Sequence, residues 1–220
     1  MTNTVIPMPE TREDQRTPAN IYLQPIAAPS ILGLYGLAGA TFMVAAHMAH
    51  WFGNGSTDLY LAPFAVMCGG LAQFLAGMWT YKARDGVATA MHGMWGAFWI
   101  SWGVLNLAFA RGVLAQPQGS FPALGYWFLA LAAITWAGMA AAGSKLLATV
   151  LGFLAAGSTI AAIANFAGSD GANILAGYLL IASALLVYFA ASGLMLRTRR
   201  SEDSSDVVLG TGEPGVIRGQ

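Results

Sequence analysis

Long apolar runs, separated by short polar or glycine-containing segments, occupy most of the chain between residues 30 and 196. A helix of roughly 20 apolar residues is long enough to cross the hydrocarbon core of a bilayer. The runs therefore predict six transmembrane helices, at about residues 30–51, 59–81, 87–110, 122–142, 145–167 and 172–196. Because the connections are short, the predicted fold is all-α, a polytopic membrane protein whose helices form an up-down bundle.

The two ends of the chain differ in composition from this central region. Both are polar, with proline near the start and serine, aspartate and glycine near the end, a mixture typical of disordered segments. The start lacks the positively charged stretch and short apolar run of a signal peptide. The predicted organisation is a disordered arm over 1–27, a six-helix domain over 28–198 and a disordered tail over 199–220.

The basic residues predict how the bundle is oriented, because cytoplasmic loops of membrane proteins carry an excess of Lys and Arg. A cytoplasmic N-terminus leaves only Arg111 outside. The other nine basic residues then lie inside: Arg12, Arg16, Lys82, Arg84, Lys145, Arg197, Arg199, Arg200 and Arg218. An even number of helices returns the C-terminus to the same side, so both termini are expected to be cytoplasmic.

Composition agrees with a membrane protein. Of the 220 residues, 56% are hydrophobic and 9% are charged, compared with about 25% charged residues in ordinary globular domains. The lipid bilayer is therefore an expected partner. The formal net charge is zero, so nucleic acid is not an expected partner. The single cysteine, Cys68, lies in an apolar run and is expected to be a small buried residue.

The stretch over residues 91–102 is the least ordinary part of the apolar region. It carries His92, Trp95, Trp99 and Trp102 among small residues, including two glycines. Glycines inside spans allow helix backbones to approach closely, so the stretch is either a packing seam or the wall of a pore. Residues three, four and seven apart share a helix face. If Trp95 faces a pore, His92 and Trp99 are expected to face it too.

The spans contain no Asp, Glu, Lys or Arg away from their ends. This excludes transport that relies on a buried carboxylate or a buried arginine. The chain also lacks recognisable catalytic, nucleotide-binding and metal-ligand motifs, so neither enzyme activity nor a cofactor is expected. His47 and His50 are three residues apart, but a metal needs further ligands, and they are more simply placed at the outer interface.

Polar side chains inside the spans need partners, because an unpaired amide or imidazole in hydrocarbon costs several kcal/mol. Gln73 and Asn165 either bond to neighbouring helices or line a wet passage for a small solute. His92 is the one group in the bundle with a reference pKa near 6.5, so it is either a neutral core residue or a sensor or relay of protons. We take Thr41, Gln73, His92, Trp99 and Asn165 as candidate substrate-pathway residues.

Four stretches of the chain resemble the acetate uptake transporter family, the succinate-acetate permeases of bacteria and their fungal relatives. Residues 28–34, Ala-Pro-Ser-Ile-Leu-Gly-Leu, stand where the family has Asn-Pro-Ala-Pro-Leu-Gly-Leu. The other three are Gly69–Gly77 running into Tyr81-Lys82, Trp95–Trp99, and Asn165–Gly168. Their order and spacing hold from residue 28 to about 196. The resemblance implies six helices, both ends inside, a pore through each protomer and a homohexameric ring.

The resemblance also implies a pore constriction of three hydrophobic side chains, which fall on Leu37, Trp95 and Leu154. The family usually has phenylalanine where Leu37 stands and tyrosine where Trp95 stands. An indole has no hydroxyl, and its N–H can only donate a hydrogen bond.

The resulting expectation is a channel or transporter in the inner membrane for acetate and similar small monocarboxylates. An apolar constriction opposes a naked anion far more than it opposes the protonated acid, so transport is expected to move a net proton. Two alternatives remain open at this stage. One is a channel for a neutral solute such as urea, a short amide or ammonia. The other is a membrane scaffold that transports nothing.

Overall fold

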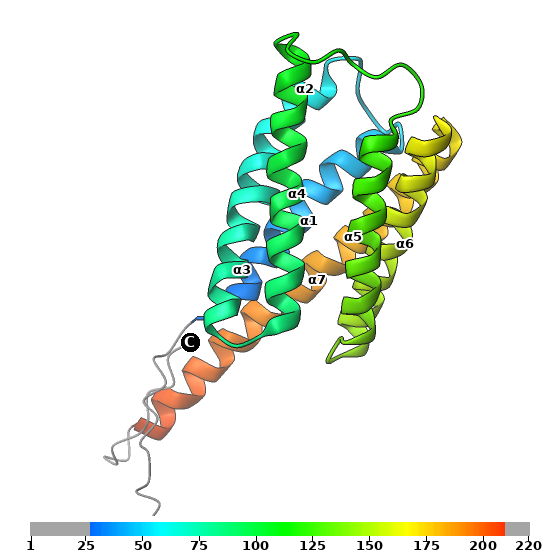
Figure 1. Cartoon of the computed structure of the whole chain (residues 1–220). Coiled ribbons are helices and arrows are strands. Elements are labelled where there is room, and N and C mark those ends of the chain that lie inside the picture. The colour runs from blue at the N-terminus through cyan, green and yellow to red at the C-terminus, as the bar shows by residue number, and fades with distance from the viewer. Residues whose placement is uncertain (1–26, 210–220) are drawn as a thin grey trace, which may run out of the picture.

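The structure, a computed structural model, describes residues 27–209, and its side chains are described as far as residue 198. Within this range the chain is all-α (Figure 1). The elements are α1 (Pro29–Met48), α2 (Thr57–Phe64), the π-helix η1 (Ala65–Ala72), α3 (Gln73–Lys82), α4 (Gly86–Ala110), α5 (Pro122–Ala140), α6 (Lys145–Ala167) and α7 (Asp170–Leu209). Because α2, η1 and α3 follow one another without a break, these elements form six long helical segments, which confirms the predicted fold class.

Five of these segments are long and apolar enough to cross a membrane: Pro29–Met48, Thr57–Lys82, Pro122–Ala140, Lys145–Ala167 and Asp170–Thr198. The sixth segment, α4, has 25 residues and is also long enough. It is not among these five spans, and it carries three tryptophans, His92 and Asn106.

The helices begin and end at residues suited to those positions. Pro29 and Pro122 stand in the first turns of α1 and α5, where a missing backbone N–H costs nothing. The side chains of Asp85 and Ser144 accept hydrogen bonds from the first turns of α4 and α6. Gly168 ends α6 with φ at 60°, a left-handed conformation that glycine adopts readily.

Two predicted helix boundaries differ from the structure by more than two residues. The first helix ends at Met48 and not at residue 51, since His50 adopts a φ of 59° that interrupts the helix. The last helix continues to Leu209, beyond the predicted end of the six-helix domain at 198. The predicted arm over 1–27 lies outside the described residues except for residue 27, and residues 210–220 of the predicted tail lie outside them as well.

The span predicted over 59–81 corresponds to Thr57–Lys82, but residues 65–72 within it form the π-helix η1, which the sequence pattern did not predict. Pro63, which lacks a backbone N–H and disturbs the helix around it, lies just before this segment. Cys68, which lies within this segment, is exposed, and this contradicts its expected burial. Irregular helix of this kind often occurs at functional sites.

The helical segments alternate in direction, so their connections gather at two opposite ends of the bundle (Figure 1). At one end α3 turns into α4, α5 turns into α6 and α7 leaves the bundle, so this end carries Lys82, Arg84, Lys145 and Arg197. We call it the basic end. The other end, formed by the connections over residues 49–56, 111–121 and 168–169, is called the mouth end.

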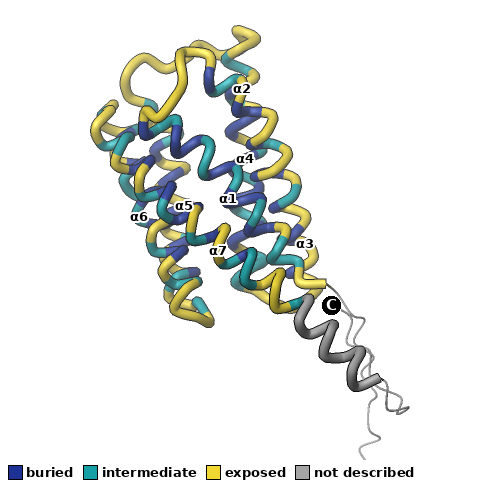
Figure 2. The backbone as a smooth tube through the Cα atoms, turned by 180° about the vertical axis from the view of Figure 1, so that it is seen from behind, coloured by how far each residue is buried: buried dark blue, intermediate teal, exposed yellow. Residues whose placement is uncertain are grey.

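The segments form a closed arrangement in which α1 packs against α7 and α3, α4 packs against α3 and η1, and α5 and α6 complete the bundle. In this arrangement α4 packs least closely against α5. Buried positions recur along each helix between exposed ones, and the connections over residues 50–56 and 111–120 are exposed (Figure 2). Glycines make the close approaches: a Cβ on Gly77 would lie 2.9 Å from the backbone N of Gly93. Close helix packing, one of the two alternatives for the stretch over residues 91–102, is therefore present.

Candidate solute pathway

A cavity of about 230 Å³ lies inside the bundle near the mouth end. Its walls come from α1, α2, α4, α5, α6 and α7. This volume holds several water molecules or one small organic solute. The cavity extends from His47 and Asp58 near the mouth to Trp95 in the middle of α4, so it is a vestibule that ends inside the bundle.

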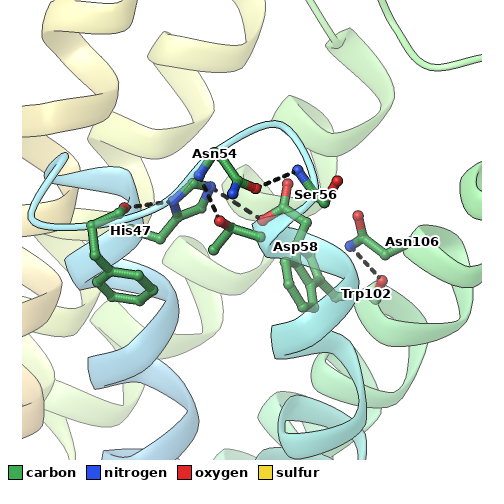
Figure 3. Close-up of polar contacts among 8 residues, drawn as sticks. His47, Asn54, Ser56, Asp58, Trp102 and Asn106 are labelled. Atoms are coloured by element: carbon green, nitrogen blue, oxygen red, sulfur yellow. Dashed lines mark hydrogen bonds and ion pairs between the residues drawn. The ribbon is translucent and has the colours of Figure 1, made fainter.

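Two histidine–aspartate pairs stand at the mouth. His47 Nε2 lies 3.6 Å from Asp58 Oδ1, and His47 Nδ1 lies 3.1 Å from the carbonyl oxygen of Phe52 (Figure 3). His50 Nε2 lies 3.1 Å from Asp170 Oδ1. The two histidines thus contact different carboxylates on different helices. Among the described residues, no three His, Cys, Asp or Glu side chains lie close enough together to hold a metal.

Aromatic rings from α4 and α5 make up much of the deeper wall. The ring centroids of Trp95 and Phe98 are 5.5 Å apart, and those of Phe98 and Trp99 are 4.9 Å apart. Phe128 on α5 lies 5.2 Å from Phe98, and Trp102 continues the series toward the mouth at 6.0 Å from Trp99. These edge and tilted contacts are the favoured geometries for aromatic pairs, so the wall is both apolar and well packed.

The glycines of η1 make room for these rings. A Cβ on Gly69 would lie 2.6 Å from Trp99 Cγ and 2.5 Å from Ala40 Cβ. A Cβ on Gly70 would lie 2.6 Å from Ile100 Cγ1. Real carbon atoms do not approach so closely, so only glycine allows η1 to lie against α4 here. The π-helical segment and its two glycines thereby fix the position of the Trp99 indole in the wall.

The predicted pathway residues divide into two groups. Thr41, Trp99 and Asn165 line the cavity. Gln73 and His92 are buried but do not line it. The amide nitrogen of Asn165 donates to the carbonyl oxygen of Ala161 at 2.8 Å, within its own helix.

The three residues assigned to the constriction lie at the floor of the cavity or below it. Trp95 lines the floor, with 2% of its surface exposed. Leu37 is one helical turn nearer the basic end than Thr41, and Leu154 lies deep in α6; both are buried. Gln73 lies at this level too, since a Cβ on Gly36 would be 3.6 Å from its backbone N.

His92 does not share the cavity wall with Trp95, contrary to the expectation that the two would line one passage together. A Cβ on Gly33 would lie 2.5 Å from His92 Cε1, so the imidazole packs directly against α1. Since α4 rises about 1.5 Å per residue, His92 is about 4.5 Å nearer the basic end than Trp95. It therefore lies beneath the floor of the cavity.

Four of the predicted pathway residues share one further property. Thr41 Oγ1, both amide atoms of Gln73, His92 Nδ1 and Trp99 Nε1 are buried and have no hydrogen-bond partner within the part of the chain that the structure describes. Buried polar atoms are nearly always partnered by protein or water. These four side chains lie on α1, α3 and α4, on both sides of the floor, so together they mark a polar course through the apolar middle of the bundle.

Several residues of the site were missed by sequence reasoning. Asp58 and Asp170 stand at the starts of helices, outside the predicted spans, so nothing in the sequence linked them to His47 and His50. Thr135 Oγ1 accepts a hydrogen bond from Trp95 Nε1 at 3.1 Å. Its isolated position in the apolar run of α5 was a usable signal, because a lone hydroxyl in a membrane span needs a partner.

Comparison with known proteins gives consistent matches. A family model described as the GPR1/FUN34/yaaH family matches residues 13–203. Proteins described as succinate-acetate/proton symporter SatP, from Escherichia coli K12 and Shigella flexneri, are 26% identical over 168 residues, covering 75% of this chain and 87% of theirs. A solved structure described as the bacterial acetate channel SatP has a TM-score of 0.73 at 23% identity. That match covers 79% of this chain and 94% of the solved chain, and it supports the same fold.

Proposed function

Because the chain belongs to the GPR1/FUN34/yaaH family, we propose that it transports acetate and related small monocarboxylates across the membrane, together with a net proton. The relatives it matches are named as a symporter and a channel and not as enzymes. The solute would enter the cavity at the mouth, pass the floor at Trp95 and leave at the basic end.

The observation that carries this proposal is the set of buried, unpartnered polar atoms on Thr41, Gln73, His92 and Trp99. Each such atom is costly in an apolar interior unless water or a solute supplies the missing hydrogen bond. The Thr41 hydroxyl and the Trp99 indole N–H can both donate to a carboxyl oxygen. Both residues line the cavity, but these two polar atoms are themselves buried, so a small acid would bind to them only when their side chains turn toward the cavity.

The constriction consists of Leu37, Trp95 and Leu154, at and below the floor of the cavity. All three are buried, and Leu154 has no exposed surface. An apolar passage of this kind opposes wetting when it is closed. Opening then requires the Trp95 ring to move or the surrounding helices to separate.

A proton is expected to accompany the acid because the passage, within the described residues, has no Lys or Arg side chain that could stabilise a carboxylate. The cavity is lined by Asp58, His47 and His50 but by no Lys or Arg among the described residues. A naked carboxylate leaving water for such a site pays a large desolvation cost. The protonated acid, with a pKa near that of a glutamic acid side chain at about 4.3, avoids this cost. We assign His92, which lies beneath the floor, the role of relaying the proton.

The remaining parts of the proposal concern assembly and location. We place the protein in the inner membrane with the basic end in the cytoplasm, because Lys82, Arg84, Lys145 and Arg197 gather there. We take the homohexamer implied by the family resemblance as the assembly, with one pathway in each protomer.

Uptake of radiolabelled acetate into proteoliposomes tests the proposal. We expect uptake that exceeds that of protein-free liposomes, rises as the external pH falls, and decreases in the Thr41→Val variant, which keeps the side-chain shape but removes the hydroxyl. Uptake that is indifferent to pH and unchanged in His92→Ala would refute the proton component. Absence of uptake at every pH would refute acetate transport.

A channel for a small neutral solute is the second candidate. It is favoured by the same absence of Lys and Arg from the cavity lining within the described residues, because a neutral solute needs no fixed cation. A liposome swelling assay separates the two candidates. Permeation of urea without permeation of acetate would replace the first proposal with the second.

A further inference from the structure

We infer that Thr135 is a positioning residue, which holds the Trp95 indole across the floor of the cavity and thereby sets which solutes pass. This inference rests on the proposed function, because it concerns selection among solutes in the same pathway. Thr135 lies on α5, and Trp95 lies on α4. The two side chains are joined by a hydrogen bond of 3.1 Å from Trp95 Nε1 to Thr135 Oγ1.

The chemistry of the pair fixes the direction of this bond. The Thr135 hydroxyl donates its own proton to the carbonyl oxygen of Leu131 at 2.6 Å. Its oxygen is then left as an acceptor, and an indole N–H can only donate. The bond is also shielded from solvent, since Trp95 is 2% exposed and Thr135 is 0% exposed. The contact is therefore specific and fully satisfied.

The location of the pair is the reason to expect that this bond influences the floor of the cavity. It crosses the junction of α4 and α5, where these helices pack least closely. The bond turns the polar edge of the indole toward α5, so the ring presents carbon atoms to the cavity. Thr135 thus keeps the floor closed and apolar, even though the threonine does not line the cavity.

The chain contains a matched pair outside the pathway. Trp136 Nε1 donates to Thr159 Oγ1 at 3.3 Å, and Thr159 Oγ1 donates to the carbonyl oxygen of Ala155 at 2.8 Å. This pair repeats the same pattern between α5 and α6, but Trp136 is 41% exposed on the outer surface. Replacing Thr159 removes an equivalent bond without touching the cavity.

The test compares Thr135→Val with Thr135→Ser and Thr159→Val in proteoliposomes, with acetate and butyrate as substrates. In Thr135→Val the Trp95 N–H loses its acceptor, the ring is released from α5, and the floor admits larger acids. We expect the ratio of butyrate flux to acetate flux to rise severalfold. Thr135→Ser keeps the hydroxyl and Thr159→Val lies elsewhere, so both are expected to keep the wild-type ratio.

Two further measurements separate positioning from a general effect on folding. In a Trp95→Phe background, Thr135→Val is expected to have no additional effect on the flux ratio, because the residue through which it acts is gone. Hydrogen exchange of the Trp95 indole N–H, identified by its loss in Trp95→Phe, is expected to be severalfold faster in Thr135→Val. This second measurement does not depend on transport.

An unchanged flux ratio in Thr135→Val would overturn the inference, and so would an equal fall in both fluxes, which indicates a purely structural role. The same holds if Thr135→Val shifts the ratio equally in the wild-type and Trp95→Phe backgrounds. A wild-type protein that passes neither acid overturns the proposed function and this inference with it. A wild-type protein that passes acetate, with Thr135→Val unchanged, overturns the inference alone.

Discussion

Two glycines three residues apart on α4 are expected to respond oppositely to substitution by alanine. A Cβ on Gly96 would lie 2.7 Å from the backbone N of Phe74, 3.0 Å from its Cα and 3.1 Å from the carbonyl oxygen of Gly70. These are backbone atoms, so they cannot rotate away. Since ordinary carbon contacts are about 3.5–4.0 Å, Gly96→Ala must separate α4 from α3 and η1, and overpacking of this kind costs about 1–3 kcal/mol.

Gly93→Ala is the matched control on the same helix. Within the described part of the chain, no atom outside the local backbone lies within 4 Å of a Cβ built on Gly93. Alanine is favoured over glycine inside a helix by about 0.5–1 kcal/mol, so this variant is expected to be neutral or more stable. The unfolding free energies of Gly96→Ala and Gly93→Ala should therefore differ by about 1.5–4 kcal/mol.

Reversible unfolding in mixed detergent micelles, followed by tryptophan fluorescence, measures this difference. Acetate uptake provides a second readout, and Gly96→Ala is expected to lower it because Gly96 adjoins Trp95 in the wall of the cavity. Equal unfolding free energies for the two variants would refute the reasoning. A greater loss of stability in Gly93→Ala than in Gly96→Ala would also refute it, because the close backbone contacts would then lie at Gly93 and not at Gly96.

Three further predictions concern the cavity and its mouth. Gly69→Ala should lower stability by about 1–3 kcal/mol and reduce acetate uptake, because its methyl group would displace the Trp99 indole; normal uptake would contradict this. Gln73→Leu should raise the unfolding free energy by about 1–3 kcal/mol yet reduce uptake, since it removes a buried amide without partners; destabilisation would indicate a structural amide. His50→Ala should change stability by less than about 1 kcal/mol, because its pair with Asp170 is exposed; a larger loss would contradict this.

The helices were predictable because apolar length alone selects them in a membrane protein. Five of the six predicted spans correspond to segments that are long and apolar enough to cross a bilayer, and the sixth corresponds to α4. The π-helix over residues 65–72 was not predictable in the same way. Its hydrogen bonds depend on how α1 and α4 pack around it, and Gly69 and Gly70 suit a close α-helical contact equally well.

The residue types of the site could be predicted from the sequence, but the position of each residue along the axis of the bundle could be predicted less well. Trp95 and Trp99, which the spacing on α4 predicted to share a face, both line the cavity. The same spacing placed His92 there as well, because residues three apart share a helix face. A helix also rises along its axis, however, and the cavity ends at Trp95. Where a cavity ends depends on contacts between helices, such as that of Gly33 with His92, which periodicity does not encode.

The stretch over residues 91–102 is both a packing seam and part of a cavity wall, and each role supports the other. Gly96 brings α4 against the backbone of α3, and this close approach supplies packing that the polar side chains nearby do not. Gln73, with 0% exposure and no partner for its amide among the described residues, would be replaced by an apolar residue if stability alone governed this position. Tight glycine contacts allow the bundle to tolerate that unpaired amide. A tolerated cost at the level of the apolar constriction is physically reasonable if a polar solute or water completes the hydrogen bonds during passage.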